Sequence, residues 1–247
     1  RLGGTHPRVR DMGLNNFRKQ WEAFLNPLVS RLGFLDPNHV SWFSLLITGA
    51  ACYMLATAGT DFDGGIRLLY ALGLVMLASA CDTIDGTIAR KFNKETAYGD
   101  FLDHTIDRIV DFLLIVAIGV NAAWMTTPHL GYAAALLTFL GSYMGTQAQS
   151  VGLGRNYGGF GRADRLVVTI LGIILAIFQA LTQTWLNVTI PIINTPLNAL
   201  SAILLISLIG GAYTFVIRFS TARSELLESE TAPLGGDSTR NDGPDDS

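Results

Sequence analysis

The chain has 247 residues, of which 49% are hydrophobic and 15% are charged, and its mean hydropathy is +0.37. Soluble domains carry about a quarter charged residues, so this composition excludes an ordinary soluble protein and indicates a membrane protein. The formal net charge is −3, and the two cysteines, Cys52 and Cys81, lie in apolar runs without metal-ligand spacing. The cysteines therefore indicate neither a disulfide framework nor a thiol nucleophile.

Residues 1–35 are predicted to form an N-terminal segment that contains one amphipathic helix. Apolar residues such as Leu14 and Trp21 recur at helical spacing over residues 14–32, and charged residues such as Arg18 lie between them. This pattern is typical of a helix that lies in the membrane interface with its basic residues toward the headgroups. A packing helix of a soluble region would give the same pattern, so both alternatives stay open.

Six apolar runs follow Pro37, and each is near the roughly 20 residues that a helix needs to cross a bilayer. They cover residues 40–59, 66–85, 103–125, 129–149, 165–186 and 198–218. We therefore predict an all-α integral membrane protein with six transmembrane helices in a domain of residues 36–220. Residues 221–247 are rich in Glu, Asp, Gly and Pro, which predicts an acidic disordered tail.

The basic residues predict how the chain lies in the membrane. They gather in the N-terminal segment, in the second connection, around residues 86–102, and in the fourth connection, around residues 150–165, whereas the other three connections carry only Arg67. Cytoplasmic loops hold an excess of Lys and Arg. We therefore expect a multi-pass protein of the cell (plasma) membrane with both termini and these two connections in the cytoplasm.

Four aspartates stand at the ends of two apolar runs, facing the predicted cytoplasmic side. The four are Asp82 and Asp85, three residues apart, and Asp103 and Asp107, four residues apart, and Asp111 continues the second set one turn further. Each set therefore lies along one face of a helix. Carboxylates at the edge of a hydrocarbon layer are costly unless they meet a cation, a substrate or water. Capping of helix ends is the alternative, but it explains one Asp per helix end and not a ladder.

All-oxygen ligands without His or Cys favour Mg²⁺, Mn²⁺ or Ca²⁺ over zinc. Two such ions a few ångströms apart are a common device for phosphoryl transfer. The aspartates therefore predict a site for two divalent metal ions that acts on a phosphate. A cation-binding membrane transporter is the competing class, because intramembrane carboxylates also relay ions. Release of CMP from a CDP-lipid would separate the two classes.

The order and spacing of these residues resemble the signature of the CDP-alcohol phosphotransferase family. The signature covers Asp82-x2-Asp85-Gly86-x2-Ala89-Arg90, eight residues, and then Gly99-x3-Asp103-x3-Asp107. The segment Pro37-Asn38-x-Val40-Ser41 is similar to the entry of the family's first span, and the resemblance covers roughly residues 20–220. Eight fixed residues at fixed gaps are far more specific than a lone glycine motif.

The resemblance implies transfer of a phosphatidyl-type group from a CDP-linked lipid to an alcohol, with release of CMP. It implies that Asp82, Asp85 and Asp103 are the principal ligands of two Mg²⁺ or Mn²⁺ ions, with Asp107 near the ions as a further ligand and as the general base. It also implies a homodimer and no nucleic-acid partner. The lipid substrate would be CDP-diacylglycerol or CDP-archaeol, and the stretch GLGRNYGGFGRADRL is similar to archaeal members.

The same resemblance implies a binding site for the CDP-lipid. Small residues would let a nucleotide approach the backbone, and an arginine would pair with diphosphate oxygens. Close helix packing and a positive-inside anchor are the structural alternatives. The residues assigned to the CDP-lipid are Pro37, Asn38, Asp85, Gly86, Ala89, Arg90 and Gly99.

The glycine-rich fourth connection predicts the acceptor site. Its arginines suit an anionic acceptor such as a polyol phosphate, although plain positive-inside charge is the alternative. The residues assigned to the acceptor are Gln147, Arg155, Arg162 and Arg165. Relatives that use inositol phosphate carry a Lys/Arg-Ala-Arg-Ala-Glu run where this chain has Gly-Thr-Gln-Ala-Gln over residues 145–149. We therefore predict glycerol phosphate as the acceptor, with inositol phosphate as the alternative.

Overall fold

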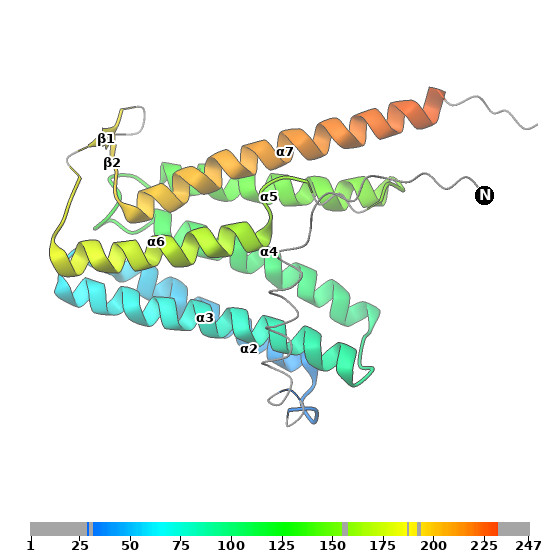
Figure 1. Cartoon of the computed structure of the whole chain (residues 1–247), viewed down its shortest axis with the longest axis horizontal. Helices are drawn as coiled ribbons and strands as arrows, with labels where there is room; N and C mark the ends of the chain where they lie inside the picture. Colours follow the sequence, from blue (N-terminus) through cyan, green and yellow to red (C-terminus); the bar gives the residue numbers. More distant parts are fainter. Residues whose placement is uncertain (1–28, 30–31, 155–157, 187, 192–193, 232–247) are drawn as a thin grey trace, which may run out of the picture.

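The computed structural model describes residues 29, 32–154, 158–186, 188–191 and 194–231. Within these residues the chain forms six long helices and one short β-hairpin (Figure 1). The helices are α2 (Pro37–Thr57), α3 (Phe62–Lys91), α4 (Ala97–Gly119), α5 (His129–Ser150), α6 (Arg162–Thr182) and α7 (Ala199–Thr231). The predicted all-α architecture is confirmed, and a helix covers most of each of the six apolar runs.

Four of these helices, α2, α3, α6 and α7, are long and apolar enough to cross a membrane. The helix α4 carries Asp103, Asp107, Arg108 and Asp111 along its length, and α5 is less apolar than α6, with Gly, Ser, Thr and Gln along its length. The described residues therefore show a membrane protein with four candidate spans inside a six-helix bundle. The two remaining helices pack against this set, α4 against α2 and α5 against α7.

Side-chain caps decide where the signature helices begin. The Oδ1 atom of Asp36 accepts a hydrogen bond of 2.9 Å from the backbone N–H of Asn38, which starts α2. The Oγ1 atom of Thr96 accepts a bond of 3.0 Å from the N–H of Gly99, which starts α4 before the predicted residue 103. Such caps satisfy backbone donors that lack a partner in the first turn. The two halves of the signature therefore lie on α3 and α4, joined by a short turn.

The helices cross closely where side chains are absent. A Cβ atom added to Gly119 of α4 would lie 2.5 Å from the Cα atom of Gly131 of α5. Small residues of this kind allow helix backbones to approach each other inside a membrane. The core of the bundle is apolar and includes Leu68, Ile118 and Leu200, which are fully buried. The crossing of α4 and α5 helps to fix α4, which carries two of the signature aspartates.

Polar side chains join the loops at the end of the bundle remote from the signature turn. Asn121 Nδ2 donates to the backbone carbonyls of Leu55 at 2.6 Å and Ala58 at 2.9 Å. Asn198 Nδ2 donates to the carbonyl of Trp124 at 2.8 Å. At the same end, β1 (Thr189–Ile190) pairs antiparallel with β2 (Thr195–Pro196), with Thr189 opposite Pro196 (Figure 1). Three connections are thereby tied together.

Two predicted boundaries differ from the structure or lie outside it. The helix α7 continues to Thr231, past the predicted end of the span at residue 218 and into the predicted tail. Residues 221–231 include three Glu and two Leu, which are good helix formers, so the helix continues beyond the apolar run. The rest of the predicted tail and nearly all of the predicted amphipathic helix at residues 14–32 lie outside the described residues.

Candidate functional site

Three carboxylates from two helices converge. Asp82 comes from α3, and Asp103 and Asp107 come from successive turns of α4. One oxygen from each lies within 4.8 Å of the other two, so the three could hold one metal ion. The spacing of four residues brings Asp103 and Asp107 to the same face of α4, and the packing of α3 beside α4 adds Asp82. Three of the four aspartates predicted as metal ligands therefore come together in the described structure, and Asp85 is not in this group.

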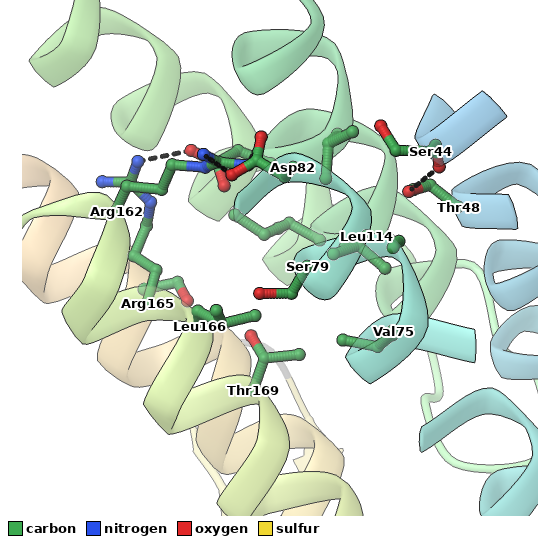
Figure 2. Close-up of a pocket in the computed structure, with 15 residues that line it drawn as sticks. Ser44, Thr48, Val75, Ser79, Asp82, Leu114, Arg162, Arg165, Leu166 and Thr169 are labelled. Carbon is green, nitrogen blue, oxygen red and sulfur yellow. Dashed lines mark hydrogen bonds and ion pairs between the residues drawn. The ribbon is translucent and has the colours of Figure 1, made fainter. Parts of the chain in front are cut away.

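The guanidinium group of Arg162, the first residue of α6, joins two of these carboxylates. Its Nη1 and Nη2 atoms donate to Asp82 Oδ2 at 3.0 Å and to Asp82 Oδ1 at 3.1 Å. Its Nη1 atom also lies 2.7 Å from Asp107 Oδ1. Figure 2 shows Arg162 and Asp82 facing each other. A planar guanidinium suits such two-pronged pairing with a carboxylate.

The donor set fits a divalent cation. The ligand atoms are all carboxylate oxygens, which Mg²⁺ and Mn²⁺ prefer. The Asp107 side chain is only 13% exposed, and its Oδ1 atom is buried without a hydrogen-bond donor among the described residues, despite the nearby ion pair. A buried acceptor without a hydrogen bond carries a free-energy cost. Coordination to a cation would satisfy this oxygen, so the residues present are suited to a metal centre.

The fourth aspartate, Asp85, is held by two hydrogen bonds. The Oγ atom of Ser41 in α2 donates to Asp85 Oδ2 at 2.6 Å, and the backbone N–H of Gly86 donates to Asp85 Oδ1 at 2.6 Å. Asp85 is 4% exposed. Hydrogen bonds of this kind lower the cost of burying an ionised carboxylate and fix its orientation. Asp85 is therefore positioned by α2 as well as by its own helix.

A cavity of about 220 Å³, here called the outer cavity, opens beside Asp85. It lies among α2, the end of α3 and the start of α4. Its lining includes both Asp103 and the charged Lys94. The lining also includes all seven residues that were assigned to the CDP-lipid: Pro37, Asn38, Asp85, Gly86, Ala89, Arg90 and Gly99. The fold thus brings together residues that are far apart in the sequence.

A second cavity of about 50 Å³, here called the inner cavity, lies deeper in the bundle (Figure 2). Asp82, Arg162 and Arg165 line it, together with Ser79 and Thr169. Figure 2 shows the hydroxyl groups of Ser79 and Thr169 directed into the space between their helices. A cavity of this size holds a few water molecules. The aspartates therefore border both cavities, Asp85 and Asp103 on the outer one and Asp82 on the inner one.

Arg165 is fixed more firmly than Arg162. Its Nη2 atom forms an ion pair with Asp111, and its Nη1 atom donates to the carbonyl of Phe160 at 3.1 Å. Its side chain is 8% exposed and its Nε atom is buried without a hydrogen-bond acceptor among the described residues. An unsatisfied buried donor carries a cost, so a ligand or water oxygen in the inner cavity would stabilise this group.

The connection before α6 is anchored on α7. The backbone N–H of Phe160 donates to Thr214 Oγ1 at 2.8 Å, and Arg218 Nε donates to the carbonyl of Gly158 at 3.0 Å. A second atom of Arg218, Nη1, donates to the carbonyl of Gly141 in α5 at 3.0 Å. These bonds set where α6 begins and hence where Arg162 stands. Arg218 was not identified from the sequence.

The family model described as CDP-alcohol phosphatidyltransferase matches residues 34–199, which is most of the chain. The chain belongs to the CDP-alcohol phosphatidyltransferase family. It is therefore a membrane transferase, as the signature predicted. The matched residues span the helices that supply the aspartates and both cavities.

Known members of the family resemble the chain in sequence and in fold. The archaetidylinositol phosphate synthase of Methanothermobacter thermautotrophicus is 30% identical over 166 residues, which cover 67% of this chain and 80% of that protein. The phosphatidylinositol phosphate synthase of Mycobacterium tuberculosis with bound CDP-DAG has a TM-score of 0.57 at 23% identity, covering 84% of this chain and 94% of that one. The same enzyme with manganese and citrate gives a TM-score of 0.58 at 24% identity, covering 84% and 89%.

The residues assigned to the acceptor do not all meet. Arg162 and Arg165 line the inner cavity. Gln147 is exposed, its Oε1 atom accepts a hydrogen bond of 2.9 Å from Tyr143, and it lines neither the inner nor the outer cavity. Arg155 lies outside the described residues. The assignment of Arg162 and Arg165 to the acceptor stays a prediction, and their position in the same cavity supports it. Gln147 has no described contact with that cavity.

Helix spacing allows Asp111 either to pair with Arg108, three residues earlier, or to orient a metal ligand. In the structure Asp111 pairs with Arg165 of α6, and Arg108 Nη1 donates instead to Ser142 Oγ at 3.0 Å. The side chains of Ser41, Ser79 and Thr169 were also missed as site residues. A stripe of Ser41, Ser44 and Thr48 along one face of α2 was the available signal for Ser41.

Proposed function

We propose that the protein transfers the phosphatidyl-type group of a CDP-linked lipid to inositol phosphate and releases CMP. The observation that carries this proposal is the aspartate cluster, which borders the outer cavity on one side and the arginine-lined inner cavity on the other. The relatives named above are synthases of inositol-phosphate lipids. Their names favour inositol phosphate, our alternative acceptor, over glycerol phosphate.

The outer cavity is the proposed CDP-lipid site. Its small residues Gly86 and Ala89 leave space beside the backbone, and Arg90 and Lys94 supply positive charge for the diphosphate. The inner side carries Arg162 and Arg165, which suit the phosphate of an anionic acceptor. The lipid is CDP-diacylglycerol or CDP-archaeol, since the described residues do not distinguish ester from ether chains.

The proposed metal ligands are Asp82, Asp85, Asp103 and Asp107, and the proposed ions are two Mg²⁺ or Mn²⁺. Bound divalent cations neutralise the diphosphate and help the CMP oxygen to leave. Asp107 accepts the proton of the acceptor hydroxyl while the oxygen of that hydroxyl attacks the lipid phosphorus. The bond between that phosphorus and the bridging oxygen of CMP breaks, and CMP leaves with the electron pair. A carboxylate within hydrogen-bond reach of the hydroxyl can perform this step.

The placement in the membrane is also proposed. We infer six transmembrane helices, in which α4 packs against α2 and α5 packs against α7. The termini and the active site face the cytoplasm, because the basic residues gather near the aspartates and not at the remote end. A homodimer completes the proposal and follows from the family resemblance alone.

The first test is release of CMP by the purified protein in detergent with Mn²⁺ or Mg²⁺. CDP-diacylglycerol and CDP-archaeol are each offered with inositol 1-phosphate, glycerol 1-phosphate, glycerol 3-phosphate, serine or no acceptor. We expect release that depends on inositol 1-phosphate and stops when the metal is chelated. Release with a glycerol phosphate alone would restore our leading sequence prediction. Release with serine alone would refute the arginine-lined acceptor site, and CMP release in none of the mixtures would favour the transporter class.

Gly86→Ala tests the outer cavity. A Cβ atom at Gly86 would meet only the flexible end of Arg90, at 3.4 Å, so the change is compatible with folding. It fills space that the proposal gives to the nucleotide. Overpacking costs about 1–3 kcal/mol, so we expect KM for the CDP-lipid to rise about 5- to 150-fold with little change in thermal stability.

Gly73→Ala is the matched control for this change. Gly73 lies on the same helix, is exposed, and has no atom within 4 Å of an added Cβ among the described residues. We expect wild-type KM and stability from it. A wild-type KM in Gly86→Ala would show that the nucleotide does not approach α3 at this point.

A further inference from the structure

Arg162 holds the carboxylate oxygens that a metal ion would use. It donates to both oxygens of Asp82, at 3.0 and 3.1 Å, and its Nη1 atom lies 2.7 Å from Asp107 Oδ1. Asp82 and Asp107 belong to the group of three carboxylates that could hold one ion, with Asp103 as the third member. A guanidinium paired with these oxygens competes with a divalent cation for them, because the two positive charges repel each other at such short range.

The two arginines of the inner cavity differ in how firmly they are held. The Arg162 side chain is 33% exposed and stands at the first residue of α6, directly after Gly161. The Arg165 side chain is 8% exposed and is held by Asp111 and by the carbonyl of Phe160. Side chains that are open to solvent change rotamer more readily than buried ones, and Arg162 is the more open of the two arginines. Movement of Arg162 away from its partners therefore disturbs the packing less than movement of Arg165 would.

We infer that Arg162 is an exchangeable counter-ion of the metal centre. It neutralises Asp82 and Asp107 until a divalent cation takes these oxygens, and the exchange releases its guanidinium toward the inner cavity, which it already lines. The released group then binds the anionic acceptor beside Arg165. Metal and acceptor therefore bind with positive coupling, and by linkage each raises the affinity for the other by the same factor. The acceptor half of this inference rests on the proposed function.

Mn²⁺ binding to the purified protein, without lipid or acceptor, tests the exchange. Free Mn²⁺ is measured by electron paramagnetic resonance for the wild type, Arg162→Gln, Arg162→Lys and Arg223→Gln. Arg162→Gln removes the cation that competes with Mn²⁺, so Mn²⁺ should bind about tenfold or more tightly. The reason is that Mn²⁺ no longer has to break the charge-assisted hydrogen bonds between Arg162 and the aspartates. Arg162→Lys keeps the positive charge but loses the two-pronged geometry. Its Mn²⁺ affinity should therefore fall between the affinities of the wild type and of Arg162→Gln.

Arg223→Gln is the matched control, because Arg223 is exposed on α7 and its loss changes the net charge equally. Mn²⁺ binding in Arg162→Gln that is no tighter than in Arg223→Gln would overturn the inference. Arg162→Lys keeps the test valid if Arg162→Gln does not fold, which thermal unfolding reports. A lysine variant that binds Mn²⁺ as the wild type does would then contradict the exchange.

Sulfate serves as the probe for the released guanidinium. We expect Mn²⁺ to tighten sulfate binding in the wild type by about fivefold or more, within the usual range of coupling between sites, and to have no such effect in Arg162→Gln. Equal coupling in both proteins would refute delivery of Arg162 to the anion. A third outcome is tighter Mn²⁺ binding in Arg162→Gln while no variant binds sulfate. This outcome would support Arg162 as a counter-ion of the metal centre, but it would refute the anionic acceptor of the proposed function.

Discussion

Asp107→Asn should lower kcat by about 10²- to 10⁴-fold, the usual contribution of a general base. The amide keeps the size of the carboxylate but cannot take a proton from the acceptor. Asp107 is 13% exposed and lies within the aspartate cluster, so an isosteric change preserves the packing of α4. The measurement is the steady-state rate of CMP release at saturating CDP-lipid and acceptor.

Separate measurements keep the role of Asp107 as base distinct from its role as a ligand. Mn²⁺ affinity and CDP-lipid affinity of Asp107→Asn are measured without turnover. A weakened metal site restored by excess Mn²⁺, with kcat still low, supports the base. Asp63→Asn makes the same chemical change at an exposed position at the remote end of α3 and should leave kcat unchanged. A kcat within a few-fold of wild type in Asp107→Asn would exclude Asp107 as the base.

Arg165→Met should lower the free energy of unfolding by about 3–5 kcal/mol, the usual cost of leaving one partner of a buried ion pair alone. The side chains of Arg165 and Asp111 are 8% and 14% exposed, so Asp111 would lose its ion-pair partner inside the bundle. Denaturant titration of the detergent-solubilised protein measures the change. Arg67→Met, which alters an exposed arginine on α3, should cost little.

The double variant Arg165→Met/Asp111→Leu separates the two roles of Arg165. Replacing both members of a buried pair by apolar residues is often neutral or stabilising, so we expect most of the stability to return. The KM for the acceptor should stay raised by about tenfold or more, because a charge-assisted hydrogen bond contributes about 1.5–3 kcal/mol. A double variant that is as unstable as Arg165→Met would show that the pair is not the source of the loss.

The sequence predicted the parts of the site that depend on local spacing. Asp103 and Asp107 share a helix face because they are four residues apart, and this holds for any packing of α4. The choice of ion-pair partner depends on packing between helices instead. Arg108 is three residues from Asp111 and was a reasonable partner by helix spacing, but the approach of α6 brings Arg165 to Asp111.

Two further features lay beyond local patterns. Gln147 was assigned by its position in the family's motif, yet the face of a helix that meets a cavity is set by its neighbours, and Gln147 is exposed beside Tyr143. The helix α4 also begins at Ala97 instead of residue 103, because a hydropathy window does not register the Thr96 cap that starts the helix in a polar stretch. The apolar central parts of the helices were predicted well, because a helix that crosses a bilayer needs about 20 mostly apolar residues and these are visible in the sequence.

The hydrogen bonds of Asn121 and Asn198 have a mechanical consequence. These two side chains fasten three loops at one end of the bundle, whereas the aspartate end holds cavities and partly exposed charges. Because this end is fastened, a change in the angle between two helices displaces the aspartate end further than the fastened end. We therefore expect motion within the bundle to alter the two cavities more than the register of the helices.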